Sequence, residues 1–342
     1  MTNSSNPWAP YEDAATILAE ETWLQGALLS NIVYGVELTL FAICFALLVK
    51  QVNRLDYERP VAFLTFITVI FILGTFFMGA NDKFTQLAFV ENRNYPGGPS
   101  KYENDMFWIP VDELGNVSFV IGNWLMDGLL VWRCMVIHSS LHRPVLYSIM
   151  FLPCLMLLAS VALGTVFLVQ TSRSSPFGAV NFTLAYFCMT LALNVVVTIF
   201  IVIRILAFRQ RIKKVLGADH VSEYVNVAAI LVESASLFSA FMILFIVPTA
   251  LNSPVAQAFI GAVGQIQTVS SFLIVFRVAT GKGWTEDTST KVMTNASSGG
   301  IRLQKISSLR FASEGSTMEV RNASKVAVNV TQELVHDGDM SV

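Results

Sequence analysis

The feature that most constrains this chain is a series of seven apolar segments, each long enough to cross the hydrocarbon core of a lipid bilayer. A core about 30 Å thick needs about 20 apolar residues of helix, and an open strand would leave backbone groups unpaired in lipid. The sequence therefore predicts an all-α, multi-pass bundle of seven transmembrane helices. The segments lie at about residues 24–49, 60–81, 114–137, 145–169, 179–204, 225–248 and 254–278.

Composition agrees with a membrane protein. Only 13% of the 342 residues are charged, against about 25% in soluble domains. The net charge of -2 gives no bulk attraction to nucleic acid. We therefore expect the lipid bilayer to be the main partner and no nucleic acid to be bound.

Lys and Arg are unevenly divided between the two sides of the bundle. Eighteen of the 22 lie on one side or in the C-terminal region, and four lie on the other side. Cytosolic loops carry the excess of positive charge, so we expect an outside N-terminus, a cytosolic C-terminus and a plasma-membrane location. Residues 1–23 would be an extracellular segment with a glycosylation candidate at Asn3, residues 24–280 the transmembrane domain, and residues 281–342 a disordered tail.

Three acids fall within the apolar segments. Glu37 and Asp127 lie in the middle of the first and third segments, and Glu233 lies nearer the cytosolic start of the sixth. A charge at such depth is unfavourable by about 2.5–3.5 kcal/mol, so these side chains should face the interior. Polar residues at comparable depth predict a buried polar layer, formed with Asn31, Tyr34, Asn123, Asn194, Gln265 and Gln267.

The partners of these acids are less certain from sequence. Arg133 is the nearest cation, and we expect it to form an interhelical pair with Glu233. Glu37 and Asp127 have no such cation, so we expect protonated carboxyls that donate hydrogen bonds to an amide. Three interpretations stay open: structural contacts between helices, a switch or ligand site, and a proton or ion path.

Two polar segments outside the membrane core are also candidates. The loop at about 82–113 contains YPGGPSKYEND and is long enough to be a lid or ligand surface, or else a plain connector. The fifth segment ends in RILAFRQRIKKVLG, between Arg204 and Gly217. This basic extension is an anchor for anionic lipid or a surface that docks a cytosolic partner.

Several classes of function are disfavoured. Retinal needs a lysine in the last segment, and residues 254–278 contain none, so we expect no cofactor. A zinc site needs several histidines, and only His138 and His142 share a helix face, while His220 and His336 lie elsewhere. No nucleophile and base can be paired with any specificity, so we expect neither a metal site nor an enzyme.

The segment NWLMDGLLVWRCMVIHS resembles the third helix of G-protein-coupled receptors in one respect. Arg133 lies near its cytosolic end, where those receptors often carry an acid-Arg-aromatic switch, but here Trp132 and Cys134 flank it. The resemblance is one of topology and a single arginine.

Four further motifs resemble a large family of seven-helix membrane proteins from mushroom-forming fungi. They are PGGPSKY, WLMDGLLVWRCMVIH, AAILVESASLFSAF and FLIVFRVATGKGW, in this order. The resemblance implies the seven-helix architecture, a fungal membrane and membership of Asp127, Arg133, Glu233 and Arg277 in the motif set. It implies no biochemical activity.

These observations predict a receptor-like sensor. A small ligand or a proton would act on the buried polar layer, and Arg133, Glu233 and Arg277 would act as cytosolic switch residues toward a signalling protein. The alternatives are a small-solute or proton transporter that uses Glu37, Asp127 and Glu233, and a structural membrane protein without a ligand.

Overall fold

The computed structural model describes residues 12–52, 58–139, 141–172, 180–216 and 222–279. Asn3, His220, His336 and the tail at 281–342 lie outside the described residues, as do most side chains of the basic extension after Arg204.

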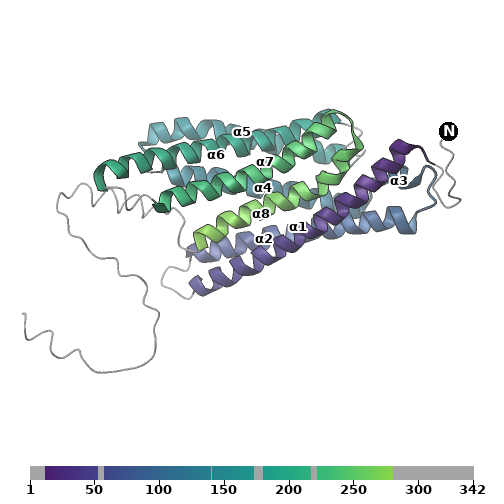
Figure 1. The fold of residues 1–342 in the computed structure, drawn as a ribbon, viewed down its shortest axis with the longest axis horizontal. Helices are drawn as coiled ribbons and strands as arrows, with labels where there is room; N and C mark the ends of the chain where they lie inside the picture. Colours follow the sequence, from purple (N-terminus) through teal and green to yellow (C-terminus); the bar gives the residue numbers. More distant parts are fainter. Residues whose placement is uncertain (1–11, 53–57, 140, 173–179, 217–221, 280–342) are drawn as a thin grey trace, which may run out of the picture. The chain divides into compact units, whose positions relative to one another are not determined.

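Seven long helices confirm the predicted all-α bundle, and a short helix lies in the loop after the second (Figure 1). Each of the seven is long and apolar enough to cross a membrane, so the chain is a multi-pass membrane protein. The bounds are α1 Ala14–Val52, α2 Glu58–Gln86, α3 Gly98–Met106, α4 Pro110–His138, α5 Arg143–Thr171, α6 Val180–Leu216, α7 Ser222–Ala250 and α8 Gln257–Ala279, with a π-helical turn at Leu87–Glu91 and a 3-10 turn at Pro254–Ala256.

The helix ends differ most from the prediction at α1. This helix begins at Ala14, inside the segment expected to precede the membrane, and has 39 residues. At 1.5 Å per residue it is about 58 Å long, almost twice the thickness of a hydrocarbon core. α1 therefore extends well beyond the apolar zone, and its first turns pack beside the loop that contains α3.

The long helices form a closed ring in which each packs against the next in sequence and α8 returns to α1. α4 and α8 make additional contacts across the ring, α4 with α6 and α8, and α8 with α2. Buried residues make up 61% and 72% of the apolar spans of α4 and α8, but only 17% in α1 and α2. α4 and α8 therefore occupy most of the interior of the bundle.

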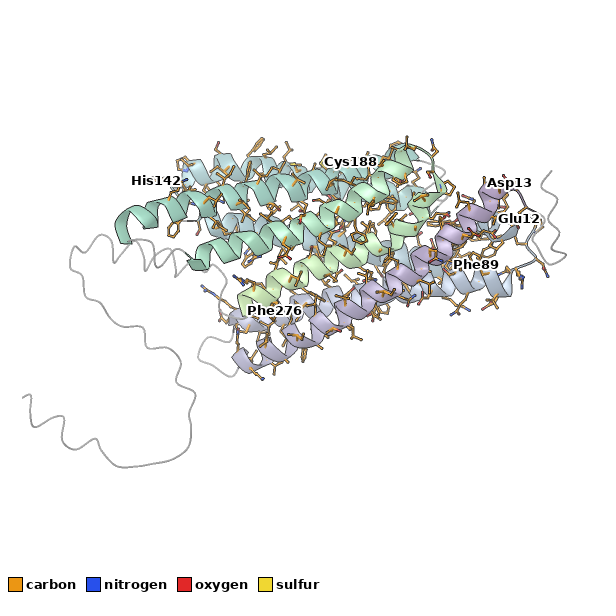
Figure 2. All side chains as sticks on the ribbon, in the orientation of Figure 1. Glu12, Asp13, Phe89, His142, Cys188 and Phe276 are labelled. Carbon is orange, nitrogen blue, oxygen red and sulfur yellow. The ribbon has the colours of Figure 1, made fainter. Side chains whose placement is uncertain are left out.

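The packing of apolar side chains agrees with a lipid surround. Large side chains stand outward along the helices, among them Leu28, Ile32, Phe151 and Leu158, which are 60–69% exposed. In contrast, all residues from Gly261 to Phe272 of α8 are buried. In Figure 2 Asp13 and Phe89 lie at one end of the bundle and His142 and Phe276 toward the other. We call the first of these the α3 end, because α3 lies there.

Candidate functional site

The two acids expected at mid-membrane depth are both buried. Glu37 is 0% and Asp127 1% exposed, and the predicted neighbours Asn123, Gln265 and Gln267 are buried with them. Tyr34 and Asn194 are half-buried. Asn31 is exposed on α1, where it donates hydrogen bonds to Asp82 and to the Ala27 carbonyl.

Asp127 is the centre of a polar contact among three helices. Ser160 Oγ on α5 donates to Asp127 Oδ2 at 3.2 Å, and Gln267 Nε2 on α8 donates to Oδ1 at 3.2 Å. A cavity of about 30 Å³ adjoins the carboxyl and is also lined by Asn194 and Ser234. A space of this size holds a water molecule. The Asp127 centre, meaning Asp127, Ser160 and Gln267, thus joins α4, α5 and α8 beside a small polar cavity.

Asn123 extends this polar contact by one helical turn toward the α3 end. Its Nδ2 donates to Tyr186 Oη at 2.7 Å and to Thr190 Oγ1 at 3.4 Å, both on α6. Asn123 Oδ1 is buried without a hydrogen-bond partner in the described part of the chain. α4 is therefore fastened by polar side chains to α5, α6 and α8 within two turns.

Glu37 lies in a different contact, between α1, α2 and α8. An ideal Cβ on Gly74 would come within 2.5 Å of Glu37 Oε1, so the carboxyl rests against the bare backbone of α2. Gln265 Nε2 donates to the Gly74 carbonyl at 3.4 Å. Neither oxygen of Glu37 has a hydrogen-bond partner among the described residues. Glu37 and Asp127 therefore belong to separate helix contacts and not to one continuous polar layer.

The expected pair between Arg133 and Glu233 is not formed. Salt bridges among the described residues join Lys83 to Glu91 and Lys101 to Asp105. Glu233 is exposed on α7, whereas Arg133 is 6% exposed within the bundle, so the two side chains face different environments. The placement of Glu233 inside the bundle was wrong, because depth along a helix does not fix which face a residue occupies.

The remaining switch candidate, Arg277, is half-buried in the last turn of α8. Arg133 Nη1 is buried without a hydrogen-bond partner in the described part of the chain. His138, at the end of α4, is buried, and its Nδ1 lies 2.8 Å from the Cys134 carbonyl oxygen.

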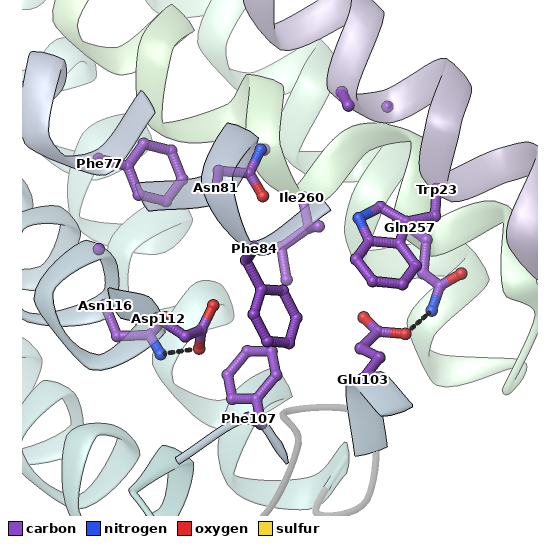
Figure 3. Close-up of a pocket in the computed structure, with 14 residues that line it drawn as sticks. Trp23, Phe77, Asn81, Phe84, Glu103, Phe107, Asp112, Asn116, Gln257 and Ile260 are labelled. Carbon is purple, nitrogen blue, oxygen red and sulfur yellow. Dashed lines mark hydrogen bonds between the residues drawn. The ribbon is translucent and has the colours of Figure 1, made fainter. Parts of the chain in front are cut away.

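A larger cavity lies at the α3 end, beside the loop at about 82–113 that the sequence offered as a possible ligand surface. Its volume is about 70 Å³, and we call it the α3-end pocket (Figure 3). It is bounded by α1, α2, α3, α4 and α8. The principal lining side chains are Trp23, Phe77, Asn81, Phe84, Glu103, Phe107, Asp112, Asn116, Gln257 and Ile260.

Two buried carboxyl groups face this pocket. Glu103 on α3 is 5% exposed and accepts a hydrogen bond from Gln257 Nε2 on α8 at 2.8 Å. Asp112 in the first turn of α4 is 9% exposed and accepts one from Asn116 Nδ2 at 2.8 Å. Burial raises the pKa of the Glu103 carboxyl to about 8; the Asp112 charge acts in the same direction, and the Gln257 hydrogen bond opposes both.

Aromatic side chains form the rest of the wall. The Trp23 and Phe84 ring centroids are 5.8 Å apart, and those of Phe84 and Phe107 are 5.9 Å apart at an interplanar angle of 80°. In Figure 3 the Phe84 and Phe107 rings stand between the carboxyl groups of Asp112 and Glu103. The site therefore combines buried acids with π faces.

The sequence contained a signal for this pocket that depth-based reasoning did not use. Glu103, Phe107 and Asp112 all belong to the loop at about 82–113, for which a ligand surface was one of two interpretations. Trp23, which directly precedes the first apolar segment, is 7% exposed and packs on Phe84 and Phe89.

A third small cavity lies along α8 between the two polar regions. A cavity of about 20 Å³, lined by Gln265 and Thr268, shares Phe77 with the α3-end pocket and Met126 with the cavity beside Asp127. α8 contributes to all three cavities in turn, through Gln257, then Gln265, then Gln267. The α3-end pocket and the Asp127 centre therefore share one helix.

The chain matches no protein-family model, and no curated protein sequence matches it. The resemblance to the fungal seven-helix proteins stays an expectation based on the four motifs. Function is accordingly inferred from the geometry of the two polar regions.

Proposed function

We propose that this protein is a receptor-like sensor in which the α3-end pocket holds a ligand and α8 transmits its presence to the Asp127 centre. The observation that carries this proposal is the course of α8, which lines the pocket with Gln257 and hydrogen-bonds Asp127 through Gln267. Both side chains belong to one uninterrupted helix. A displacement at one end must therefore strain contacts at the other.

Several physical properties support a ligand at the α3 end in preference to the Asp127 centre. The pocket is the larger of the two cavities, at about 70 Å³ against about 30 Å³. One oxygen of each pocket carboxyl accepts a hydrogen bond, while both oxygens of Asp127 do so. A group with an unused acceptor beside open space is suited to a ligand, and a saturated one is suited to holding helices together.

The mechanism is a two-state bundle whose balance depends on ligand contacts that differ between the states. A ligand between α3 and α8 would pull on Glu103 and Gln257, which are already joined at 2.8 Å. The shift would pass along α8 to Gln267 and on to Arg277 in its last turn. Arg133 and Arg277 would then present a changed surface to a signalling protein.

We further propose a plasma-membrane location with the α3 end outside. The distribution of the 22 Lys and Arg residues supports this orientation. It places the pocket in contact with the external medium and the ends of α4 and α8 toward the cytosol. Glycan attached at Asn3, with none on the tail, is the expected result of a glycosylation assay.

The proposal is tested by a conformational readout in the full chain. A fluorophore attached to Cys188, which is exposed on α6, would report helix movement in lipid nanodiscs while candidate ligands are added. A ligand that changes the signal in the unaltered chain, but not in Gln257→Leu or Gln267→Leu, supports transmission along α8. A ligand whose effect survives the Gln267→Leu substitution would contradict it.

A transporter is the second candidate, and the series of cavities along α8 favours it. Phe77 and Met126 are the side chains shared between neighbouring cavities, so they would act as the constrictions of a path. Glu37 and Asp127 lie buried near this path. Flux of a small solute or of protons into reconstituted vesicles, increased by Met126→Ala, would favour transport, whereas a sensor should move nothing.

A further inference from the structure

The α3-end pocket contains side-chain oxygen atoms that could accept a hydrogen bond but have no donor among the residues that the structure describes. Glu103 and Asp112 each carry a carboxyl oxygen that accepts no hydrogen bond among the described residues, and both side chains are at least nine-tenths buried. Gln257 Oε1 is also buried without a partner in that part of the chain. Three acceptors without donors surround one cavity, so a ligand that supplies N–H or O–H donors fits it.

The charge of the region selects a cation among such ligands. Among the described residues, Lys83 forms a salt bridge with Glu91 and Lys101 forms one with Asp105. Neither salt bridge involves Glu103 or Asp112. Two further acids, Glu12 and Glu20, lie close to the N-terminus of α3. Their proximity is shown by Gly98, where an ideal Cβ would contact both carboxylates. When they are ionised, these carboxyls attract cations and repel anions. A bound cation would lower the raised pKa of Glu103 and so favour release of its proton.

The aromatic walls separate an organic cation from a bare metal ion. Phe84 and Phe107 stand between the two carboxyl groups, so their oxygens do not converge on a single point (Figure 3). A calcium ion needs six to eight oxygens at about 2.3–2.6 Å, and no group of three or more acidic, His or Cys side chains in the described residues could hold a metal ion. The faces of Trp and Phe rings instead favour an ammonium group with attached carbon.

The volume limits the size of that cation. About 70 Å³ exceeds the space of a single water, but it is well below the roughly 300–1,000 Å³ of pockets for drug-sized ligands. A molecule of a few heavy atoms is the largest that fits without rearrangement.

We propose that the α3-end pocket binds a small primary ammonium ion, with an N–H group donating to the free oxygen of Glu103 and its alkyl group against the Phe84 and Phe107 rings. The Asp112 carboxyl, on the other side of these rings, acts as a second negative charge without a direct hydrogen bond to the ion. This inference rests on the proposed function in taking the same pocket as the ligand site. It adds the ligand class, because charge, acceptors, ring faces and volume select the same chemistry.

The test is a titration of the full chain in lipid nanodiscs with methylammonium and ethylammonium chloride, at constant ionic strength set by sodium chloride. A saturable rise in the thermal unfolding midpoint is expected with both amines, and none with tetramethylammonium, which has no N–H donor and is too large. Glu103→Gln should raise the half-saturation concentration by about 10- to 100-fold, as loss of a charge-assisted hydrogen bond does. Asp112→Asn should raise it by less, because it removes a negative charge and no direct hydrogen bond. Asp105→Asn is the matched control, since it removes one charge from the same helix outside the pocket.

A second measurement does not depend on variants that fold. Saturation of the aromatic protons of the unaltered chain should transfer to the methyl protons of methylammonium, and excess ethylammonium should abolish the transfer. Amines that act no differently from sodium chloride, equal affinity in Glu103→Gln and Asp105→Asn, or a response to calcium chloride alone would each overturn the proposal. Amine binding without any conformational signal would defeat the sensor proposal only, and a signal from another ligand with no amine binding would defeat this one only.

Discussion

The α3-end pocket and the Asp127 centre both bury carboxyl groups against α8, but they use them differently. At the Asp127 centre, Ser160 and Gln267 occupy both oxygens of one carboxyl. In the pocket, each of two carboxyls keeps a free oxygen beside a cavity more than twice as large. The difference teaches that burial of an acid does not by itself indicate a ligand site. What distinguishes the two regions is whether the protein supplies all the donors.

The largest effect on stability is expected from adding a side chain at Gly26, where α1 approaches α8 closely beside the pocket. A Cβ at Gly26 would overlap the Gln257 backbone carbonyl, which cannot rotate away. Gly26→Ala should therefore destabilise the bundle by about 1–3 kcal/mol and abolish ligand binding in the pocket. Unfolding by SDS in detergent micelles measures the first effect.

Gly35→Ala is the matched control on the same helix. Nothing lies within 4 Å of a Cβ built at Gly35, so stability should be unchanged or improved by up to about 1 kcal/mol, the helix preference of Ala. Equal destabilisation by both substitutions would show that the close approach of α1 and α8 at the pocket is not as described.

The next largest effect is expected at the Asp127 centre. Asp127→Leu leaves the Ser160 hydroxyl and the Gln267 amide without their acceptor, which should destabilise the bundle by about 1–3 kcal/mol. Asp127→Asn keeps one acceptor oxygen and should lose less. If the two variants unfold at the same SDS concentration, the hydrogen bonds of Asp127 do not hold the helices.

An intermediate effect is expected from pH at the α3 end. Burial raises the pKa of Glu103 from 4.5 to about 8, with Asp112 from α4 as the charge that acts on it. The folded state then holds this proton more tightly than the unfolded state, so its contribution to stability is complete below about pH 4.5 and is lost as pH rises through about 8. Thermal unfolding between pH 5 and 9 should show this decline.

Glu103→Gln should flatten that decline, since an amide does not titrate. Asp105→Asn should leave it in place, because the hydrogen bond from Lys101 lowers the pKa of Asp105, and its titration falls below 3.8. A decline that survives Glu103→Gln would place the responsible group elsewhere.

The smallest effect is expected at Glu37. Neither of its oxygens has a hydrogen-bond partner among the described residues, and Gln has nearly the same shape. Glu37→Gln should change the free energy of unfolding by less than Asp127→Leu does, because it replaces one buried polar group without a described partner by another of nearly the same shape. A loss as large as that of Asp127→Leu would show that Glu37 has a partner, such as a water or an ion, that fixes α1 to α2.

The helices were predictable from sequence, but the faces they bury were not. A segment of about 20 apolar residues must be a helix in lipid, whatever its neighbours are. Which side of it meets protein depends on polar asymmetry, and α7 has little separation between a polar and an apolar face. Consecutive helical residues point about 100° apart, so Ser234 is buried and the adjacent Glu233 is exposed.

The pocket was harder to predict because it depends on contacts between distant segments. Glu103 and Gln257 are 154 positions apart in the chain and meet at 2.8 Å. From sequence, Glu103 was one of several acids in a loop, and no periodicity marked it as the inward-facing one. Asp127 was easier to identify, because an acid within an apolar helix has few stable environments.

The continuous burial of α8 from Gly261 to Phe272 has a mechanical consequence. The other helices expose apolar side chains to the bilayer, and these contacts fix the depth of each helix. α8 is surrounded by neighbouring helices over this stretch and makes few such contacts. At Gly261 and Gly264 the missing side chains let Ser30 and Phe119 of neighbouring helices pack closely against α8. Because α8 is one continuous helix, any shift along its axis, such as the rise of one residue, about 1.5 Å, would move Gln257 and Arg277 together.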